Sequence, residues 1–281
     1  MLAIKSLKHL YYLLQTSEKE LEEILANLDN YYKPYQEPKK KKDGTIRTKN
    51  GIVETRKICP SIGRLKKIQN KIKTQILRKY EFKDFVQGGV KGKDNITNAN
   101  VHKGNKYFFT TDLKDFFPSI NNRVVYQTFI KNSFSADVSS VLTKLTTYQG
   151  NVPQGIPTST YISNITALSL DYDLVNLCNE NEIIFTRFVD DLSFSSKKDF
   201  QQVTQQIIEI IKGHKFRISD RKTLYKIGPT EITGVEVRNN VIKASKGILE
   251  KYETATTEKR KQGLRGYIER VKKGSLVRKS K

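Results

Sequence analysis

Cysteine is scarce in this sequence of 281 residues, and long hydrophobic runs are missing. The two cysteines, Cys59 and Cys178, lack the spacing of a metal site or a disulfide framework, so we expect reduced structural thiols. No apolar span predicts a membrane helix, and lysines interrupt the first residues where a secretion signal would need an apolar core. These absences argue against disulfide-rich, membrane-spanning and secreted classes and favour a cytoplasmic protein.

Acidic residues are also few relative to basic ones. The chain has 51 Lys and Arg against 29 Asp and Glu, a formal charge of +22. Such an excess predicts a polyanionic partner, and nucleic acid is the natural candidate; a soluble basic protein or a membrane-surface binder is the alternative. The excess continues into the segment 243–281, where helical spacing leaves one face free to meet phosphate. Candidate contacts there are Lys251, Arg260, Arg265 and Lys272.

Two adjacent carboxylates, Asp190 and Asp191, stand between two apolar runs within residues 183–195. Such runs predict the half-buried strands of a hairpin, and Asp tolerates the conformations that its turn needs. Because side-by-side acids repel, a divalent cation such as magnesium is the first hypothesis for what they bind. An ordinary Asp-rich turn is the alternative.

A third acid follows an aromatic strand-like run. Residues 106–111 lead to Asp112, and Pro118 stops the segment soon afterwards. If this strand pairs beside the hairpin, three carboxylates converge at one end of a sheet. That arrangement suits two-metal phosphoryl transfer and indicates nucleotidyl transfer.

The rest of the chain alternates helical and extended patterns. Residues 1–29 predict two helices, with Ser17 as an N-cap. The lysines of 39–42 and the following turn predict a charged hairpin. Apolar spacing predicts helices from Leu65 and over 200–211, and the glycines after Gln87 allow a close backbone approach.

Taken together, the motifs resemble the reverse transcriptase family. Residues 111–120 (TDLKDFFPSI), 152–159 (VPQGIPTS) and 188–191 (FVDD) follow in the order of that family's palm motifs. The segments 98–102 (NANVH) and 232–234 (ITG) are similar to two signatures of bacterial retron reverse transcriptases, Asn-Ala-x-x-His and Val-Thr-Gly. Two departures are Phe188 in place of the family's Tyr and Ile232 in place of Val.

The resemblance implies an α+β right-hand polymerase fold. Residues 1–105 would form N-terminal helices and fingers with an RNA-contacting segment. Residues 106–238 would form the palm with its antiparallel catalytic sheet, and 239–281 a short, basic, helical thumb.

The same resemblance implies roles for individual residues. Asp112, Asp190 and Asp191 would be catalytic and, with the backbone carbonyl of Leu113, would hold two Mg²⁺ ions. The incoming deoxynucleotide would be contacted by Arg56, Phe117, Gln154, Gly155 and Lys222. The retron signatures would contact RNA through Asn98, His102, Thr233 and Gly234. A structural histidine at position 102 and a surface lysine at position 222 remain alternatives. A core aromatic is the alternative for Phe117 and suits the neighbouring Phe116 better, but spacing alone does not choose between the two.

The implied activity is RNA-directed DNA synthesis. In retrons this starts from a 2′-hydroxyl of the enzyme's own structured non-coding RNA and yields a branched RNA–DNA molecule, in a defence system against phage that includes an effector protein. Another defence-associated or group II intron-like reverse transcriptase is the second hypothesis. A non-catalytic RNA-binding scaffold with the same fold is the third.

Overall fold

A computed structural model describes residues 3–41 and 44–276 of the chain. The chain divides into two compact units. The helical unit comprises Met1–Glu81 and Asp115–Leu168, and the sheet unit comprises Phe82–Lys114 and Ser169–Lys281. Lys42, Asp43 and the last five residues of the expected thumb lie outside the described residues.

The helical unit carries the expected N-terminal helices and two small antiparallel strand pairs. Ser17 caps the second helix, because its Oγ accepts from the backbone N–H of Glu20 at 3.2 Å. Strand β1 pairs with β4 and β2 with β3. The elements are α1 Leu7–Leu14, α2 Glu18–Ala26, η1 Leu28–Tyr31, β1 Tyr35–Pro38, β2 Thr48–Lys49, β3 Ile52–Val53, β4 Thr55–Ile58, α3 Gly63–Lys71, η2 Ile72–Ile76, η3 Leu77–Lys79, α5 Phe116–Ser119, α6 Asn122–Lys131, α7 Ala136–Thr146 and α8 Ser159–Thr166.

The helix predicted from Leu65 is confirmed at its start but is not uniform. Helix α3 passes into the π-helical turn η2 and then the 3₁₀ turn η3. A π turn adds a residue and so rotates the next turn of the helix. Ile76 and Leu77, adjacent in sequence, are both fully buried.

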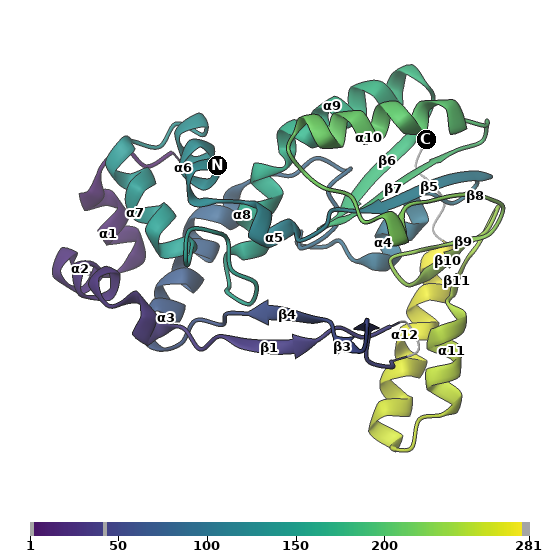
Figure 1. Cartoon of the computed structure of the whole chain (residues 1–281), viewed down its shortest axis with the longest axis horizontal. Helices are drawn as coiled ribbons and strands as arrows, with labels where there is room; N and C mark the ends of the chain where they lie inside the picture. Colours follow the sequence, from purple (N-terminus) through teal and green to yellow (C-terminus); the bar gives the residue numbers. More distant parts are fainter. Residues whose placement is uncertain (1–2, 42–43, 277–281) are drawn as a thin grey trace. The chain divides into compact units, whose positions relative to one another are not determined.

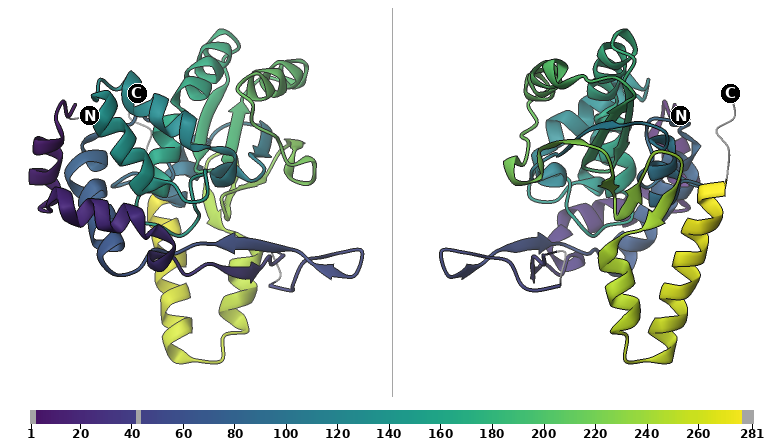
Figure 2. Two further views of the ribbon diagram at one scale, coloured as in Figure 1. Left: turned by 60° about the vertical axis from the view of Figure 1, so that its left-hand side comes forward. Right: turned by 90° about the vertical axis from the view of Figure 1, so that its right-hand side faces the viewer.

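The sheet unit is built on four antiparallel strands in the order β6-β7-β5-β8. Helices α9 and α10 cover one face, and α4 lies on the other (Figure 1). A second sheet has the order β11-β10-β9, and α11 and α12 form an antiparallel hairpin (Figure 2). The elements are α4 Asn95–Val101, β5 Tyr107–Asp112, α9 Leu168–Glu180, β6 Ile184–Phe188, β7 Asp191–Ser196, η4 Gln201–Val203, α10 Thr204–Gly213, η5 Asp220–Lys222, β8 Leu224–Ile227, β9 Thr230–Ile232, β10 Val235–Val237, β11 Ile242–Ala244, α11 Lys246–Glu253 and α12 Glu258–Leu276.

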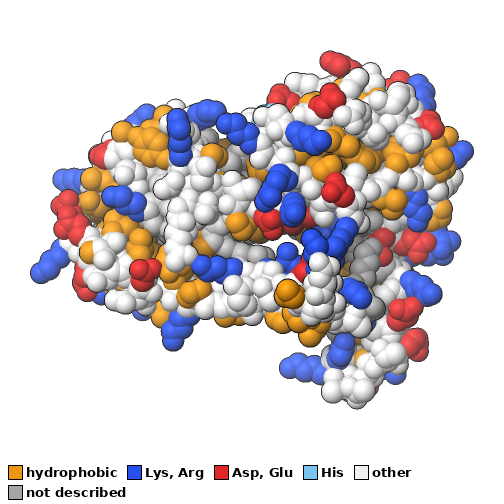
Figure 3. Space-filling view, in the orientation of Figure 1, with side chains coloured by type: hydrophobic (Ala, Val, Ile, Leu, Met, Phe, Trp, Pro, Cys, Tyr) orange, Lys and Arg blue, Asp and Glu red, His pale blue; other side chains and the backbone are white. Residues whose placement is uncertain are grey.

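The surface reflects the composition. Lys and Arg side chains are spread over the face shown in Figure 3 and are not collected at a single place on it. Within residues 3–41 and 44–276, no helix combines the length and apolar character that a bilayer crossing requires.

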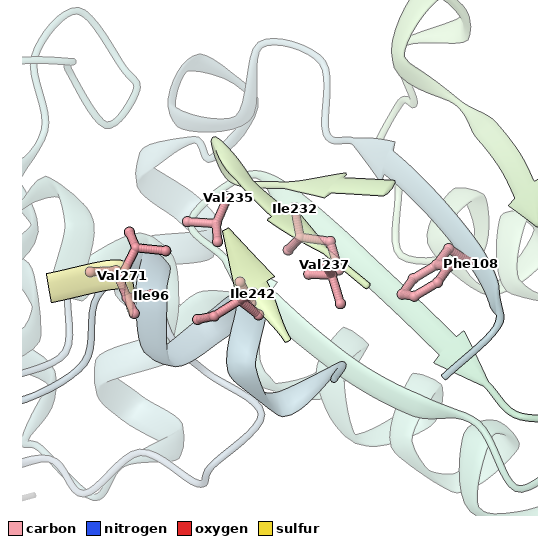
Figure 4. Packing of buried hydrophobic residues seen from close by; sticks show 8 residues of the cluster. Ile96, Phe108, Ile232, Val235, Val237, Ile242 and Val271 are labelled. Atoms are coloured by element: carbon pink, nitrogen blue, oxygen red, sulfur yellow. The ribbon is translucent and has the colours of Figure 1, made fainter. Parts of the chain in front are cut away.

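Alternation along the strands divides the core of the sheet unit into two layers. On one face Phe194 packs on Phe185 and Phe109, with ring centroids 5.0 and 5.7 Å apart. On the other, Phe108 joins a buried apolar cluster with residues of α4, the second sheet and α12 (Figure 4). The α+β class with an antiparallel central sheet is therefore confirmed.

Candidate active site

The structure brings the three acids together at one end of the four-stranded sheet. Asp112 is the last residue of β5 and lies directly opposite Asp191, the first residue of β7. The backbone N–H of Leu113 donates to the backbone carbonyl of Asp190 at 2.9 Å, which joins the strand end to the turn. The pairing expected from the sequence is therefore present.

The hairpin turn that carries Asp190 has an unusual backbone. Phe188 pairs with Asp191, so Val189 and Asp190 form a two-residue turn. Val189 has φ 61°, a left-handed conformation that a β-branched residue seldom adopts. Such conformations persist where the surroundings enforce them, and they cluster at functional sites.

One enforcing contact comes from the backbone at Gly88. A Cβ atom there would lie only 2.4 Å from the backbone nitrogen of Val189. Only glycine therefore lets this segment lie so close to the turn. The close approach expected for these glycines is made to the hairpin that carries Asp190 and Asp191.

A second enforcing contact comes from a buried ion pair that no sequence motif predicted. Arg187 donates from Nε and Nη2 to the two carboxylate oxygens of Asp171 at 2.7 and 2.6 Å, and both side chains are fully buried. Nη1 of Arg187 also donates to the carbonyl of Val189 at 3.0 Å. The sequence did contain a signal for this pair: Arg187 is a single charged residue within an apolar strand, and Asp171 is an acid within an apolar helix. Such buried charges need a partner of opposite sign.

Negative charge is concentrated at the acids. Burial, followed by the charge of Asp112, raises the pKa of Asp190. Burial and the charge of Asp190 raise the pKa of Asp191 to about 7. Raised pKa values mean that the ionised carboxylates repel one another and are poorly solvated here. A bound cation would relieve both effects and stabilise the ionised form.

Lys222 supplies one positive charge to the cluster. Its ammonium group donates to the carboxylate of Asp112 and lies 3.9 Å from Oδ1 of Asp191. Burial alone would lower the pKa of Lys222, but the hydrogen bond and charge of Asp112 outweigh it and the pKa is raised. The ammonium form is therefore favoured.

The donor set fits magnesium in an open site. Among the described residues, no three or more His, Cys, Asp and Glu side chains form a ready-made set of metal ligands. Magnesium does not require one, because it is usually held by one or two carboxylates together with water and substrate phosphates. The hard carboxylate oxygens of Asp112, Asp190 and Asp191 suit that mode of binding.

The expected nucleotide contacts other than Lys222 belong to the helical unit. Arg56 lies on β4 and pairs with Glu37 at 3.1 Å. The carbonyl of Gln154 accepts from the backbone N–H of Cys59 at 2.7 Å. Gly155 has φ +110°, and a Cβ there would lie 2.9 Å from Ile58 Cγ2. The turn at Gln154 and Gly155 therefore packs against the end of the strand that carries Arg56.

The two aromatic residues after Asp112 differ in exposure. Phe116 is 2% exposed and belongs to the core. Phe117 is only partly buried, with its ring centroid 5.7 Å from that of Phe116. Of the two, Phe117 has the ring area left to meet a ligand.

The expected RNA contacts fall into three groups. Thr233 and Gly234, in the turn between β9 and β10, are partly buried. Lys251, Arg260, Arg265 and Lys272 are exposed on α11 and α12. Asn98 and His102, in contrast, have no exposed surface. Both ring nitrogens of His102 are hydrogen-bonded inside the protein, at 2.7 Å to Ser195 and to Thr186. The structure therefore favours the structural alternative for His102 and gives no support to a direct RNA contact by either side chain.

Comparisons with known proteins agree with this geometry. The family model described as reverse transcriptase (RNA-dependent DNA polymerase) matches residues 39–237. The Retron Se72 reverse transcriptase of Salmonella heidelberg is 30% identical over 255 residues, which cover 86% of this chain and 64% of that protein. The Retron Ec86 reverse transcriptase of Escherichia coli is 30% identical over 198 residues, which cover 69% and 62%. The chain thus spans less than two thirds of the length of both relatives.

A solved structure supports the fold. Telomerase from Candida albicans, determined with a fragment of telomeric RNA, matches with a TM-score of 0.50 and 12% sequence identity, over 90% of this chain and 59% of that one. The right-hand polymerase fold expected from the sequence is confirmed. With a family model that covers most of its length and three acids that meet at the end of its sheet, this chain belongs to the reverse transcriptase family, the RNA-dependent DNA polymerases.

Proposed function

We propose that this chain is an RNA-directed DNA polymerase that copies part of a cognate structured RNA into DNA. The observation that carries the proposal is the meeting of Asp112 with Asp190 and Asp191, because phosphoryl transfer depends mainly on positioning and on charge stabilisation. The raised pKa values of Asp190 and Asp191 support a site that works with a bound cation.

In this proposal Asp112 and Asp190 hold two Mg²⁺ ions, with Asp191 close by and the backbone carbonyl of Leu113 as a further ligand. When bound there, magnesium would supply Lewis-acid chemistry, making the attacking hydroxyl more acidic and offsetting the charge of the triphosphate. The task of the protein is to fix these acids, which the strand pairing and the strained turn accomplish.

The remaining site residues bind and orient the deoxynucleotide. The guanidinium of Arg56 contacts the triphosphate. Phe117 packs under the sugar, where a ribose 2′-hydroxyl would clash, and Gln154 and Gly155 border the nascent pair. Lys222 donates a proton to the leaving pyrophosphate, a role supported by the raised pKa that keeps its ammonium protonated.

The nucleic acid is held by basic residues. Lys251, Arg260, Arg265 and Lys272 contact backbone phosphates from α11 and α12. Residues 1–105 serve as fingers, 106–238 as palm and 239–281 as thumb.

Similarity to named retron enzymes supports a retron role. Synthesis would then start from a 2′-hydroxyl of the cognate non-coding RNA and give a branched RNA–DNA product. The protein would act in the cytoplasm, with an effector protein, in defence against phage.

Labelling of nucleic acid tests the proposal. The protein is purified with its RNA and incubated with labelled deoxynucleotides and Mg²⁺, beside the double variant Asp190→Asn, Asp191→Asn and the control Asp199→Asn, an acid outside the cluster. We expect RNA-linked DNA from wild type and Asp199→Asn only. Equal labelling by the double variant would refute catalysis here, and RNA binding without any DNA synthesis would favour the scaffold. Synthesis from an added primer, but never from the RNA's own 2′-hydroxyl, would favour another reverse transcriptase class.

A further inference from the structure

The two signature segments of this chain, far apart in sequence, meet inside the sheet unit. The side-chain N–H of Asn98 donates to the hydroxyl of Thr233 at 3.2 Å. The hydroxyl of Thr186 on β6 donates to the side-chain carbonyl of Asn98 at 2.7 Å. The first signature is thus bonded both to the second and to a strand of the catalytic hairpin.

His102 extends this contact to the second strand of the hairpin. Its Nε2 lies 2.7 Å from Thr186 Oγ1, and its Nδ1 lies 2.7 Å from Ser195 Oγ on β7. Asn105 also donates to Ser195 Oγ, at 2.7 Å. Asn98, His102, Asn105, Thr186, Ser195 and Thr233 form what we call the signature network.

The donors and acceptors of the network determine which partner donates in each hydrogen bond between Asn105 and Asn98. Because the Thr186 hydroxyl gives its hydrogen to Asn98, it accepts from Nε2 of His102. Nε2 therefore carries a proton, and the tautomer that this defines accepts at Nδ1 from the hydroxyl of Ser195, which in turn accepts from Asn105. Each of these two hydroxyls donates once and accepts once, so a connected set of buried groups is satisfied.

The network holds the hairpin on the face that carries a catalytic acid. Side chains alternate along a strand, so Ser195 and Asp191 share one face of β7. Thr186 lies on that face too, because it pairs with Ser193. His102 therefore bridges β6 and β7 on the side of Asp191. If the pairing of β7 shifted by one residue, Asp191 would point to the opposite face and the imidazole ring of His102 would lose its hydrogen bonds to Thr186 and Ser195.

The same network continues to α12. The side-chain N–H₂ of Asn95 donates to the carbonyl of Thr233 at 3.1 Å and to the hydroxyl of Tyr267 at 2.8 Å. Apolar contacts surround this link, including Ile96, Ile232 and Val271 (Figure 4). Apolar packing is not directional, whereas hydrogen bonds specify one arrangement of α4, the second sheet and α12.

We infer that Asn98, His102 and Thr233 are positioning residues, which set the hairpin of β6 and β7 against α4 and α12, and that Asn98 and His102 do not act by touching RNA. Asn98, His102 and Ser195 have no exposed surface, and Thr186 is 1% exposed. RNA therefore has no surface of Asn98 or His102 to touch. This inference rests on the proposed polymerase function for its activity readout.

Paired substitutions separate positioning from RNA contact. Thr186→Val and Thr233→Val keep the β-branched shape but lose the hydroxyl, whereas Thr186→Ser and Thr233→Ser keep it. Thr146→Val is the matched control, since Thr146 is a fully buried threonine of α7 whose hydroxyl donates to the carbonyl of Leu142 in its own helix. RNA affinity is measured without deoxynucleotides, and the rate of DNA synthesis is measured on saturating RNA.

We expect both Val variants to lower the rate about tenfold or more, as a misplaced catalytic group does, with RNA affinity and KM for deoxynucleotide nearly unchanged. The Ser variants and Thr146→Val should keep the wild-type rate. Lower RNA affinity with an unchanged rate on bound RNA would overturn the inference, as would Val variants that behave like wild type.

Amide hydrogen exchange of residues 184–196 gives a readout independent of activity. Exchange should rise in both Val variants and stay at the wild-type level in the Ser variants. If wild type makes no DNA, the proposed function fails, and exchange alone decides whether the network holds the hairpin. If Thr186→Val does not fold, the Thr233 pair decides, because Thr233 is only partly buried. Unchanged exchange in Thr233→Val would refute the inference.

Discussion

Substitution of Gly88 by alanine should disable catalysis while leaving the protein folded. The added Cβ would lie 2.4 Å from the nitrogen of Val189, 2.7 Å from its Cγ2 and 2.8 Å from the carbonyl carbon of Phe188. Two of these three atoms belong to the backbone, so no flexible side chain can move away to make room. Ordinary contact begins near 3.4 Å, so the turn must shift by about 1 Å.

That shift moves Asp190, the next residue of the turn. A displacement of about 1 Å in a catalytic group can lower the rate about 100-fold. Overpacking of this kind costs about 1–3 kcal/mol of stability, which most folded domains tolerate. We therefore expect Gly88→Ala to lose about two orders of magnitude in the single-turnover rate of nucleotide addition, with a modest fall in melting temperature.

Gly213→Ala is the matched control. Gly213 ends helix α10, and a Cβ there would have no atom within 4 Å. This variant should keep the wild-type rate and gain slightly in stability, because alanine favours a helix. A folded Gly88→Ala protein with a rate within about threefold of Gly213→Ala would refute the argument that Gly88 sets the position of the turn.

Three further predictions concern the carboxylates and the core. Burial raises the pKa of Asp191 to about 7 in the folded protein. Between about pH 4 and pH 7 the folded, metal-free protein therefore binds a proton that the unfolded chain has released. The free energy of unfolding should fall as the pH rises through this range and then level off. Thermal unfolding across this range checks it, and an unchanged slope in Asp191→Asn would contradict it. Asp171→Asn leaves the charge of Arg187 buried without its partner, so the unfolding free energy should drop by about 3–5 kcal/mol in urea denaturation. The control is Glu182→Gln, which removes the acid of an exposed ion pair with Lys198. If Asp171→Asn costs no more stability than this control, the buried pair contributes little. Phe116→Ala should lose about 3–5 kcal/mol of stability, because the ring is buried in the core. Phe117→Ala should stay folded and incorporate more ribonucleotides than wild type. Unchanged selectivity between deoxyribonucleotides and ribonucleotides would argue against the proposed role of Phe117.

Local patterns predicted the parts of the fold that depend on neighbouring residues. Alternating apolar residues on both sides of Asp190 and Asp191 indicated a hairpin, and β6 and β7 form it. Ser17 before an apolar helical pattern indicated a cap, which the structure contains. Such signals are readable because strand alternation and helix capping involve residues only a few positions apart.

The contacts that support the turn at Val189 and Asp190 could not be predicted in this way. The sequence indicated that Gly88 allows a close approach but not that Val189 is what it approaches. It contained Arg187 and Asp171 without indicating that they pair. It suggested RNA contacts for Asn98 and His102, whose side chains face the protein interior. In each case the partner is distant in sequence, and no local pattern specifies it.

By itself, the sequence determined which groups are present: three acids beside strand-like runs, an excess of basic residues and the order of the motifs along the chain. Tertiary structure alone decided which groups hold those acids in place, because hydrogen bonds and close contacts depend on positions in space rather than on spacing along the chain. The pairing of Asp112 with Asp191 illustrates both: the residue types were evident from the sequence, and their meeting required the pairing of β5 with β7.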